Sequence, residues 1–393
     1  MKIAVVGCGI GGMANAIQLA RSGHNLTVFE SFPEARPLGA GLLLQPTGLE
    51  ALAALELCQE IKERGAEIDA LVGRRPDGKL IMDLRYAYAR REDIGIGIHR
   101  ATLFDALHKA MLIEGVDLRT NSAVQSIETP DNPIIHLENG NTEGPFDCVI
   151  VSDGAHSKLR NIVSPIATAP QYPWGAVWTI LPDASGIWHN KRLLAQVYSG
   201  TQIMIGVLPA GENPHDPDGP DCVSFFWSLE TNSVENWRSA GLAAFKEEVT
   251  QFWPEASELI SNVQTLDAFL PASYRDVRCP NWSKGKIILI GDAAHGASPQ
   301  LGQGANMALC DAVALASCLQ EFAPTKAFLN YEKERRPTLR YYTWMSWALT
   351  PIFQGHAKWV GGIRDAVFGM ICRLPGLRNI MAWTLVGRGR WFW

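Results

Sequence analysis

Short apolar runs of strand length recur along the chain, and glycine-rich segments follow three of them. The runs Lys2–Gly7, Phe146–Val151 and Lys286–Ile290 each predict a buried strand that ends at such a segment. Two stretches with few helix breakers, Met13–Arg21 and Ala305–Leu319, predict helices. Strands that alternate with helices are typical of an α/β fold built on a parallel sheet.

The first glycine-rich segment has the spacing of a dinucleotide-binding turn. Gly7 permits the tight turn, Gly9 lets the backbone approach a pyrophosphate, and Gly12 lets the following helix pack closely on the strand. The N-terminus of that helix then points at the phosphates. A further strand, Asn25–Phe29, ends at Glu30, 23 residues beyond Gly7, where an acid can accept hydrogen bonds from ribose hydroxyls. The segment therefore predicts a bound dinucleotide.

Alternating stretches in the middle of the chain predict a second sheet. Arg192–Tyr198, Gln202–Leu208 and Val223–Leu229 are typical of antiparallel strands. The aromatic and apolar side chains of this region suit a pocket for a flat ring or, alternatively, the ordinary core of the sheet. These side chains are Trp174, Trp178, Tyr198, Met204, Phe225 and Trp227.

Length and composition narrow the possibilities. A chain of 393 residues is too long for one compact core, so we expect two domains. The eight cysteines are scattered without CxxC spacing, which indicates reduced thiols, a cytoplasmic protein and no metal cluster. The sequence contains no run of about 18 uncharged apolar residues, so we expect no membrane-spanning helix. Basic residues are interleaved with Trp, Leu and Gly rather than clustered, so we expect no nucleic-acid binding.

Taken together, the three glycine-rich segments resemble the fingerprints of class A flavoprotein monooxygenases, the para-hydroxybenzoate hydroxylase family. The segments are VVGCGIGG at Val5–Gly12, SDGAHSKLR at Ser152–Arg160 and GDAAHGASPQLGQGAN at Gly291–Asn306. The resemblance covers residues 1–340 and extends to Glu34–Gly41, His99–Leu107 and Tyr331–Pro337. One departure is Val151-Ser152, where the family usually has a small residue and alanine.

This resemblance implies that FAD is bound along all three segments. The residues expected to contact it are Gly7, Gly9, Gly11, Gly12, Glu30, Arg36, Gly41, Arg100, Asp153, Asp292, Pro299, Gly302, Gly304, Ala305 and Asn306. Asp292 can accept a hydrogen bond from the ribityl chain, and Pro299 fixes its loop against one flavin face. The N-terminus of the helix that begins at Ala305 would face the pyrimidine half of the ring and stabilise the anionic reduced flavin.

Three residues of the second and third motifs have alternative roles. In the family, the acid and the arginine of the second motif, here Asp153 and Arg160, have been linked to handling of the nicotinamide cofactor. Alternatively, these two residues merely pair to hold the turn. His295 belongs to the family's GDAAH signature, and we expect it to be structural rather than a base.

The resemblance also implies a monooxygenase reaction. NADH or NADPH would reduce the flavin, O2 would add at C4a, and the resulting C4a-hydroperoxyflavin would transfer one oxygen atom to an aromatic or heteroaromatic small molecule. Because only one GxGxxG-type fingerprint is present, the nicotinamide cofactor is expected to bind transiently. The loop Pro37–Pro46 is a candidate for lining the path of a moving flavin.

The sequence names no catalytic base. The pocket candidates are Tyr198, Met204, Phe225, Trp227 and Pro299, and the guesses at a base are Tyr198, Tyr274 and His189. Such roles depend on geometry that a sequence does not contain.

The expected architecture is a Rossmann-like FAD-binding domain with a discontinuous antiparallel-sheet substrate domain and a C-terminal helical segment. The FAD-binding domain would comprise residues 1–73, 94–165 and 273–340. The substrate domain would comprise 74–93 and 166–272, and the helical segment 341–393. We expect a monomer or a homodimer.

The C-terminal segment carries an apolar stripe at helical spacing, which Pro375-Gly376 ends. The stripe consists of Trp359, Val360, Ile363, Ala366, Val367, Met370, Ile371 and Leu374. Residues 341–393 contain six basic residues and one acid, a balance of +5. The stripe either packs on the acidic FAD-binding domain or makes a peripheral membrane contact. The second possibility supports an alternative function, a membrane-associated FAD-dependent reductase of the geranylgeranyl-reductase type. A ligand-binding flavoprotein without turnover is a further alternative.

Overall fold

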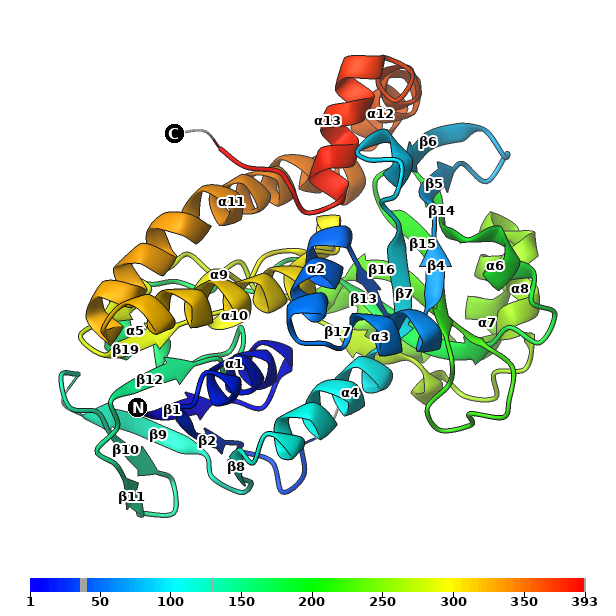
Figure 1. The fold of residues 1–393 in the computed structure, drawn as a ribbon. Coiled ribbons are helices and arrows are strands. Elements are labelled where there is room, and N and C mark those ends of the chain that lie inside the picture. Colours follow the sequence, from blue (N-terminus) through cyan, green and yellow to red (C-terminus); the bar gives the residue numbers. More distant parts are fainter. Residues whose placement is uncertain (36–40, 129, 392–393) are drawn as a thin grey trace.

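A six-stranded sheet has the connectivity of a dinucleotide-binding domain (Figure 1). The computed structural model describes residues 1–35, 41–128 and 130–391. The strand order is β18 (Ser283–Lys284), β19 (Ile287–Leu289), β12 (Cys148–Val151), β1 (Lys2–Val6), β2 (Asn25–Phe29) and β8 (Asp117–Arg119). All neighbours are parallel except β18 and β19. The four buried strands predicted from the apolar runs are therefore present.

Helices pack on this sheet and on one another. They are α1 (Ile10–Arg21), α4 (Arg100–Ile113), α10 (Gly304–Glu321), α2 (Pro46–Ala54) and α11 (Pro324–Phe353). α1 contacts α4 and α10, and α10 also contacts α2 and α11. The approach of α1 to α10 is close, because a Cβ at Gly11 would lie 3.4 Å from the Cβ of Ala308. Both α1 and α10 begin inside their glycine-rich segments, slightly earlier than the sequence predicts.

Smaller elements connect the dinucleotide-binding sheet to the rest of the molecule. One three-stranded sheet consists of β3 (Gly41–Leu44), β7 (Gly95–His99) and β4 (Ala66–Ile68), with α3 (Cys58–Arg64) beside it. Another consists of β9 (Val124–Glu128), β10 (Ile134–Leu137) and β11 (Thr142–Glu143). The β3–β7–β4 sheet packs tightly on the second large sheet, because a Cβ at Gly97 would lie 1.9 Å from the carbonyl oxygen of Pro209.

The second large sheet contains seven strands and includes the alternating stretches of the sequence. Their order is β17 (Leu270–Ala272), β13 (Trp174–Pro182), β16 (Cys222–Glu230), β15 (Ile203–Gly211), β14 (Leu193–Ser199), β5 (Ala70–Arg74) and β6 (Leu80–Arg85). The sheet is antiparallel except where β14 pairs with β5. β5 lies in part before residue 74, where the sequence places the start of the substrate domain.

The period-two alternation of this sheet separates its side chains onto two faces. One face packs against α7 (Val234–Phe252) and α8 (Pro254–Ser261), and its core includes Phe225 and Trp227. Phe225 contacts Phe269 edge to face, and Trp227 lies 5.3 Å from Phe245, centroid to centroid. These two pocket candidates are therefore core residues on the face opposite to Tyr198 and Met204, a correction to the sequence-based prediction.

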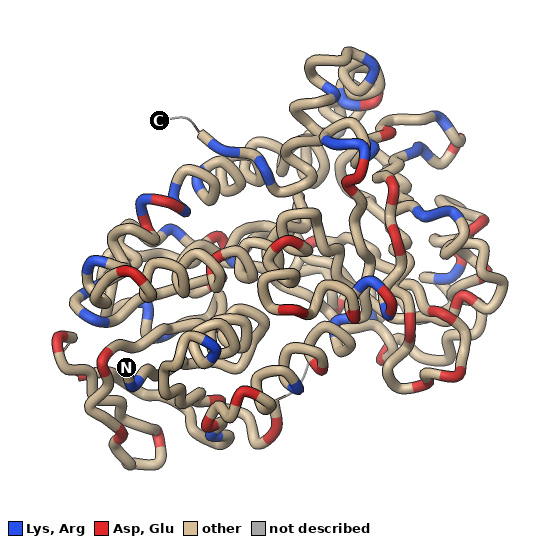
Figure 2. The backbone as a smooth tube through the Cα atoms, viewed as in Figure 1, with Lys and Arg blue, Asp and Glu red and all other residues tan. Residues whose placement is uncertain are grey.

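The last two helices close one end of the molecule (Figure 1). α12 (Lys358–Ile371) packs on β6, and α13 (Pro375–Leu385) packs on the short helix η1 (Tyr86–Tyr88). Their inner sides share a core with Tyr198 and Phe226 of the seven-stranded sheet. In Figure 2, Lys and Arg alternate with Asp and Glu over the outside of the described residues.

Candidate cofactor site and active site

The first glycine-rich segment forms a tight turn between β1 and α1. Gly7 has a φ of +99°, a conformation that side-chain-bearing residues rarely adopt. A Cβ at Gly12 would lie 2.0 Å from the carbonyl oxygen of Gly7, whereas a Cβ at Gly9 would meet no protein atom within 4 Å. Gly9 is exposed and is the N-cap of α1, with no side-chain hydrogen bond to the cap. The helix N-terminus is thus open to an approaching phosphate.

Glu30 lies beside this turn, at the carboxyl end of β2. It is only 8% exposed, and its Oε2 accepts a hydrogen bond of 2.8 Å from the amide of Cys8. Its Oε1 accepts one of 3.0 Å from the amide of Phe32. The carboxylate is thereby held next to the glycine turn, as a ribose-binding acid requires. Burial, reinforced by Glu30, raises the pKa of the Cys8 thiol to about 12, so Cys8 stays protonated.

The second motif is tied to the first by Ser152. Its hydroxyl lies 2.9 Å from the carbonyl oxygen of Val6 and 3.1 Å from that of Gly7. This explains the departure from the family pattern at this position, since the hydroxyl bonds the carbonyls of the glycine turn. Next to it, one carboxylate oxygen of Asp153, Oδ1, is buried and has no hydrogen-bond partner among the described residues. Burial raises the pKa of Asp153, against the opposing effects of Ser157 and Arg160.

Arg160 connects the second motif to the third. This residue begins α5 (Arg160–Val163), is 4% exposed, and its Nε donates to the carbonyl of Ala293 at 2.6 Å. One terminal nitrogen donates to the carbonyl of Ala155 at 2.9 Å and lies 3.3 Å from that of Gly154. Its hydrogen bonds therefore go to backbone carbonyls of both loops. Arg160 thus holds the two loops through their backbone, and no ion pair between Arg160 and Asp153 is found among the described residues.

The third motif places Asp292 at the carboxyl end of β19, in the short helix α9 (Asp292–His295). Asp292 is exposed although its neighbours are buried. Arg100, at the start of α4, lies nearby: burial lowers the pKa of its guanidinium, and Asp292 and Tyr274 act in the opposite direction. Two residues that the resemblance assigns to FAD, Arg100 and Asp292, are thus brought together from distant parts of the sequence.

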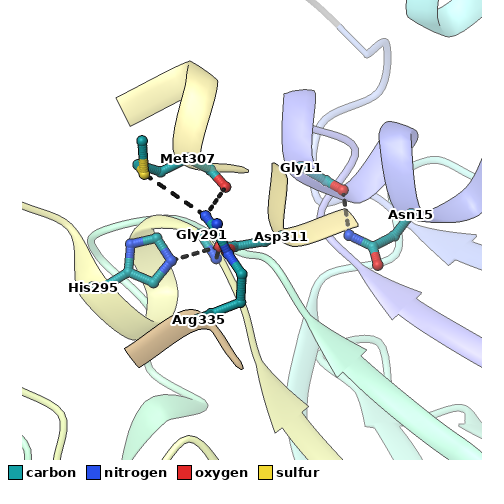
Figure 3. A network of polar contacts seen from close by, with 7 residues as sticks. All are labelled: Gly11, Asn15, Gly291, His295, Met307, Asp311 and Arg335. Carbon is teal, nitrogen blue, oxygen red and sulfur yellow. Dashed lines mark hydrogen bonds and ion pairs between the residues drawn. The ribbon is translucent and has the colours of Figure 1, made fainter. Parts of the chain in front are cut away.

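A buried charge network holds the third motif in place (Figure 3). Asp311 of α10 is fully buried and accepts hydrogen bonds from Arg335 Nε at 2.8 Å and from the Gly291 amide at 3.2 Å. His295 Nε2 lies 2.6 Å from Asp311 Oδ2, the oxygen that also accepts from Gly291, whereas Arg335 bonds Oδ1. Burial alone would raise the pKa of Asp311, but His295 and Arg335 outweigh it and hold the pKa well below its usual range. His295 is therefore engaged in positioning the loop.

The N-terminus of α10 is a second open helix end. Its N-cap, Gln303, makes no side-chain hydrogen bond to the cap. The side chain of Asn306 is fully used within the protein: Oδ1 accepts from the Gln45 amide at 2.9 Å, and Nδ2 donates to the Leu43 and Gly302 carbonyls. Only the backbone of Asn306 is left for a cofactor. Gln45 Nε2 and Gln303 Oε1 are buried without partners among the described residues, two polar atoms that sequence reasoning missed.

The remaining predicted contacts of FAD fall into three groups. Pro299 begins the short helix η4 (Pro299–Leu301), the exposed Gly302 follows it, and the exposed Gly304 is the first residue of α10. Gly41 serves packing, because its amide donates to Ser224 Oγ at 3.2 Å and a Cβ there would lie 2.4 Å from the Cβ of Ser224. Arg36 lies outside the described residues, as do residues 37–40 of the loop proposed to line the flavin path.

An aromatic surface of the seven-stranded sheet adjoins these loops. Trp178 and Phe226 stack with ring centroids 4.7 Å apart. Burial raises the pKa of Tyr274 to about 12, although the neighbouring Trp178 and the charge of Arg100 both act to lower it. The Tyr274 hydroxyl is therefore a hydrogen-bond donor at neutral pH and not a base.

A chain of hydrogen bonds also joins the loop of the third motif to this sheet. Gln300 of η4 donates to the Tyr172 hydroxyl at 3.2 Å and bonds Gln354 at the end of α11. Gln354 in turn donates to Ser228 Oγ of β16 at 2.6 Å. The other pocket candidates lie elsewhere: Tyr198 lines a cavity of about 330 Å³ beneath α12, and Met204 packs in the same core.

His189 is not brought to this region. It belongs to α6 (Ile187–Lys191), where its Nδ1 lies 3.3 Å from Asp221. Of the three guesses at a base, only Tyr274 is therefore near Arg100 and Asp292. Among the described residues no group of three or more His, Cys, Asp or Glu could hold a metal ion.

Comparison with known proteins identifies the family. The model of the FAD binding domain family matches residues 1–343 of the chain. The chain belongs to this family. It is 28% identical over 336 residues to the probable 2-heptyl-3-hydroxy-4(1H)-quinolone synthase of Rhodococcus erythropolis, covering 85% of this chain and 83% of the relative. It is 30% identical over 347 residues to the 3-amino-4-hydroxybenzoate 2-monooxygenase of Streptomyces cremeus, covering 86% and 84%.

A solved structure with the same fold is that of the tetrameric form of 2-methyl-3-hydroxypyridine-5-carboxylic acid oxygenase. It superposes with a TM-score of 0.80 at 20% identity and covers 99% of this chain and 98% of that chain. The predicted fold class and the predicted flavoprotein family are confirmed. The relatives named here are synthases, monooxygenases and oxygenases, so the alternative of a geranylgeranyl-type reductase is not favoured.

The described residues fit FAD. The two uncapped helix ends, the exposed Gly9 and Asp292, and the partnerless Asp153 oxygen all lie in the three segments of this FAD-binding protein. The first segment would hold the pyrophosphate, Glu30 the adenosine ribose, and Asp292 with Arg100 the ribityl portion. The N-terminus of α10 would lie near the flavin ring, where its partial positive charge favours an anionic reduced ring.

His99 should make the stability of this site depend on pH. Its Nδ1 accepts a hydrogen bond of 3.0 Å from the Ala101 amide and caps the helix that begins with Arg100. Burial first, and His215 second, lower the pKa of His99 from 6.5 to about 4. The folded state therefore disfavours the protonated ring, and stability is fully present above pH 6.5 and is lost as the pH falls toward 4.

We expect His99→Asn to flatten this pH dependence by up to about 3 kcal/mol, since asparagine caps helices but does not titrate. Urea unfolding between pH 4 and 7 measures the effect. His156→Asn, at an exposed position, serves as the control and should keep the wild-type slope. An unchanged slope in the His99 variant would contradict the assignment.

Proposed function

We propose that this protein is an FAD-dependent monooxygenase that uses NAD(P)H and O2 to hydroxylate an aromatic or heteroaromatic small molecule. The observation that carries the proposal is the meeting of the FAD loops with an aromatic sheet surface. Tyr274 is close enough to both Arg100 of the cofactor site and Trp178 of the sheet for each to shift the pKa of its hydroxyl. A flat ring would pack against Trp178, which is partly exposed and is backed by the buried Phe226.

The similarity to relatives named for quinolone and hydroxybenzoate substrates supports a ring that carries a hydroxyl, oxo or amino group. Such a group makes the ring electron-rich and gives it one polar edge. Tyr274 is the polar side chain placed to meet that edge, and it would donate a hydrogen bond because its hydroxyl stays protonated. We propose a fused heteroaromatic ring of this kind as the substrate.

In this proposal bound FAD would supply the reduction and oxygen-transfer chemistry, while the protein would position the ring and exclude water. Trp178, held in place by the buried Phe226, would fix the ring plane, and Tyr274 would fix the rotation of the ring within that plane. The network from Gln300 through Gln354 to Ser228 would keep the cofactor loop at a fixed distance from the sheet. The reaction would then depend mainly on orientation of the bound ring.

Tyr274→Phe tests this role. We expect hydroxylated product per NAD(P)H oxidised to fall roughly tenfold to hundredfold, because one orienting hydrogen bond is lost. FAD content should stay at the wild-type level. The measurement is product formation by mass spectrometry, alongside NAD(P)H absorbance, on a panel of phenols, hydroxypyridines and 4-quinolones.

Tyr198→Phe is the matched control, because Tyr198 lies under α12 and its hydroxyl bonds Gln196 instead. It should leave the product yield within about twofold of wild type. Equal yields for wild type and Tyr274→Phe on every accepted ring would contradict the assigned role. Reduction of a lipid double bond without O2 consumption would instead establish the reductase.

A further inference from the structure

The C-terminal helix α12 turns its apolar side outward, unlike an ordinary surface helix. The apolar stripe that the sequence predicts for this helix faces outward: Trp359 is 70% exposed, Ile363 53% and Met370 59%. The side that packs on the protein instead includes Arg364, whose side chain is fully buried. An amphipathic helix in water normally turns its apolar stripe to the core, so another surface is required to cover this one.

Buried Arg364 is well accommodated, which shows that the orientation is built into the packing. Its guanidinium lies 4.9 Å above the centre of the Tyr198 ring and 5.6 Å from that of Phe353. It also pairs with Asp365 at 2.7 Å. Gly361 completes the fit, because a Cβ there would come within 3.0 Å of the backbone of Gly200. Rotating the helix to bury its stripe would break all of these contacts.

The exposed apolar surface continues onto α13, where Leu377 is 43% exposed, Ile380 60% and Trp383 40%. Ten of the nineteen exposed large apolar side chains of the described residues lie between Trp344 and Trp383, about a tenth of the chain. We define the outer face as Trp359, Ile363, Met370, Leu377, Ile380 and Trp383. Both helices lie at the end of the molecule away from β1 and β12 (Figure 1). Exposed apolar residues gathered in this way mark an interaction surface.

We propose that the outer face docks on the surface of a lipid bilayer that contains anionic headgroups. Tryptophan at the edge of an apolar face is typical of the headgroup zone, and arginine attracts anionic lipids. The exposed Arg373 and Arg390 lie in the same segment. Its single acid, Asp365, is turned toward Arg364 and is mostly buried. Because the segment carries a net positive charge, two copies docked through it would repel each other in a symmetric dimer, whereas anionic headgroups neutralise the charge.

The proposed contact is peripheral. Within residues 1–35, 41–128 and 130–391, none of the helices has the length and hydropathy of a membrane-spanning segment. Helices that lie in the interface bind through one apolar face plus attraction to anionic lipid. This inference does not depend on the proposed hydroxylation, because it rests on the orientation and charge of α12 and α13 alone.

The test is co-sedimentation of the FAD-loaded protein with vesicles of phosphatidylcholine, with and without phosphatidylglycerol. We expect binding to the mixed vesicles and a loss of at least about tenfold in partitioning for the triple variant Ile363→Ser, Met370→Ser, Ile380→Ser. The matched control is Ile113→Ser, Ile166→Ser, Leu329→Ser, which removes three side chains of similar exposure on other surfaces. The control should bind like wild type.

Charge is tested separately. Arg373→Gln and Arg390→Gln should each weaken binding to the phosphatidylglycerol vesicles by about fivefold, and added salt should do the same. Absence of wild-type binding to either vesicle would overturn the proposal. An equal loss of vesicle binding in the outer-face triple variant and in its control would also overturn the proposal. So would a wild-type dimer, seen in sedimentation equilibrium, that dissociates only in the outer-face variant.

Discussion

Replacing Gly9 by alanine should abolish tight binding of FAD without unfolding the protein. The backbone at Gly9 is extended, with φ −82° and ψ −178°, so alanine fits without strain. No protein atom lies within 4 Å of the added Cβ, which would point into the space where a phosphate meets the N-terminus of α1. We expect the dissociation constant of FAD to rise roughly a hundredfold or more, because a glycine at this position lets the backbone approach the pyrophosphate closely.

Titration of the flavin-free variant with FAD, followed by flavin fluorescence, measures this effect. Gly12→Ala gives the contrasting case, because its Cβ would lie 2.0 Å from the Gly7 carbonyl oxygen and the fold itself must shift. Gly376→Ala, where a Cβ meets nothing within 4 Å, controls for the substitution. If Gly9→Ala binds FAD as tightly as wild type, the phosphate site is not at this turn.

Asp311→Asn should be the most destabilising conservative change in the third motif. It removes the charge that compensates Arg335, which is 11% exposed in its side chain, and it weakens the bond to the Gly291 amide. Removing one partner of a buried pair costs about 3–5 kcal/mol, because the other charge stays buried. We expect the free energy of unfolding, measured with urea at saturating FAD, to fall by that amount. We also expect the cofactor to be retained more weakly.

The same residue predicts a pH window. The pKa of Asp311 is held well below its usual range in the folded state, so its contribution is fully present above the unfolded value of about 4. That contribution is lost as the pH falls below 4, a window separate from that of His99. Because Asp311→Asn lacks the titrating carboxylate, its free energy of unfolding should not show this decrease below pH 4. Glu60→Gln, which breaks an exposed pair with Arg64, should cost less than about 1 kcal/mol. A similar cost for both variants would contradict the role of Asp311.

The fold was largely predictable because local patterns determine it. Buried parallel strands are continuous apolar runs, and glycines at fixed spacing mark the turn at which a dinucleotide binds. The predicted strand Asn25–Phe29 agrees with β2 residue for residue, and Gly7 has the positive φ that the turn requires. That Arg100 and Asp292 belong to one cofactor site was expected only from the resemblance, because nearly two hundred residues separate them in the chain.

Long-range contacts could not be predicted. Ser152 departed from the family pattern, yet nothing local indicates that its hydroxyl reaches the carbonyls of Val6 and Gly7. The identity of the side chains also did not decide which face of the second sheet meets the cofactor. Phe225 and Phe226 are adjacent and chemically identical, but one packs on α7 and the other stacks on Trp178. A shift of one residue reverses the face, and only the tertiary arrangement fixes it.

The C-terminal segment illustrates the same limit. The apolar period of α12 was visible, but a period cannot tell whether the stripe faces a core or the outside. The buried Arg364, which packs on the adjoining rings of Tyr198 and Phe353, decides the question.

The central claim is that this FAD-binding protein inserts one atom of O2 into an aromatic ring. The most direct test is turnover under ¹⁸O-labelled O2 with NADH or NADPH and a panel of hydroxylated heteroaromatic rings, with products analysed by mass spectrometry. We expect one labelled oxygen atom in the product of at least one ring, formed in step with NAD(P)H oxidation. Oxidation of NAD(P)H that yields only hydrogen peroxide with every ring, or an unlabelled product, would contradict the account.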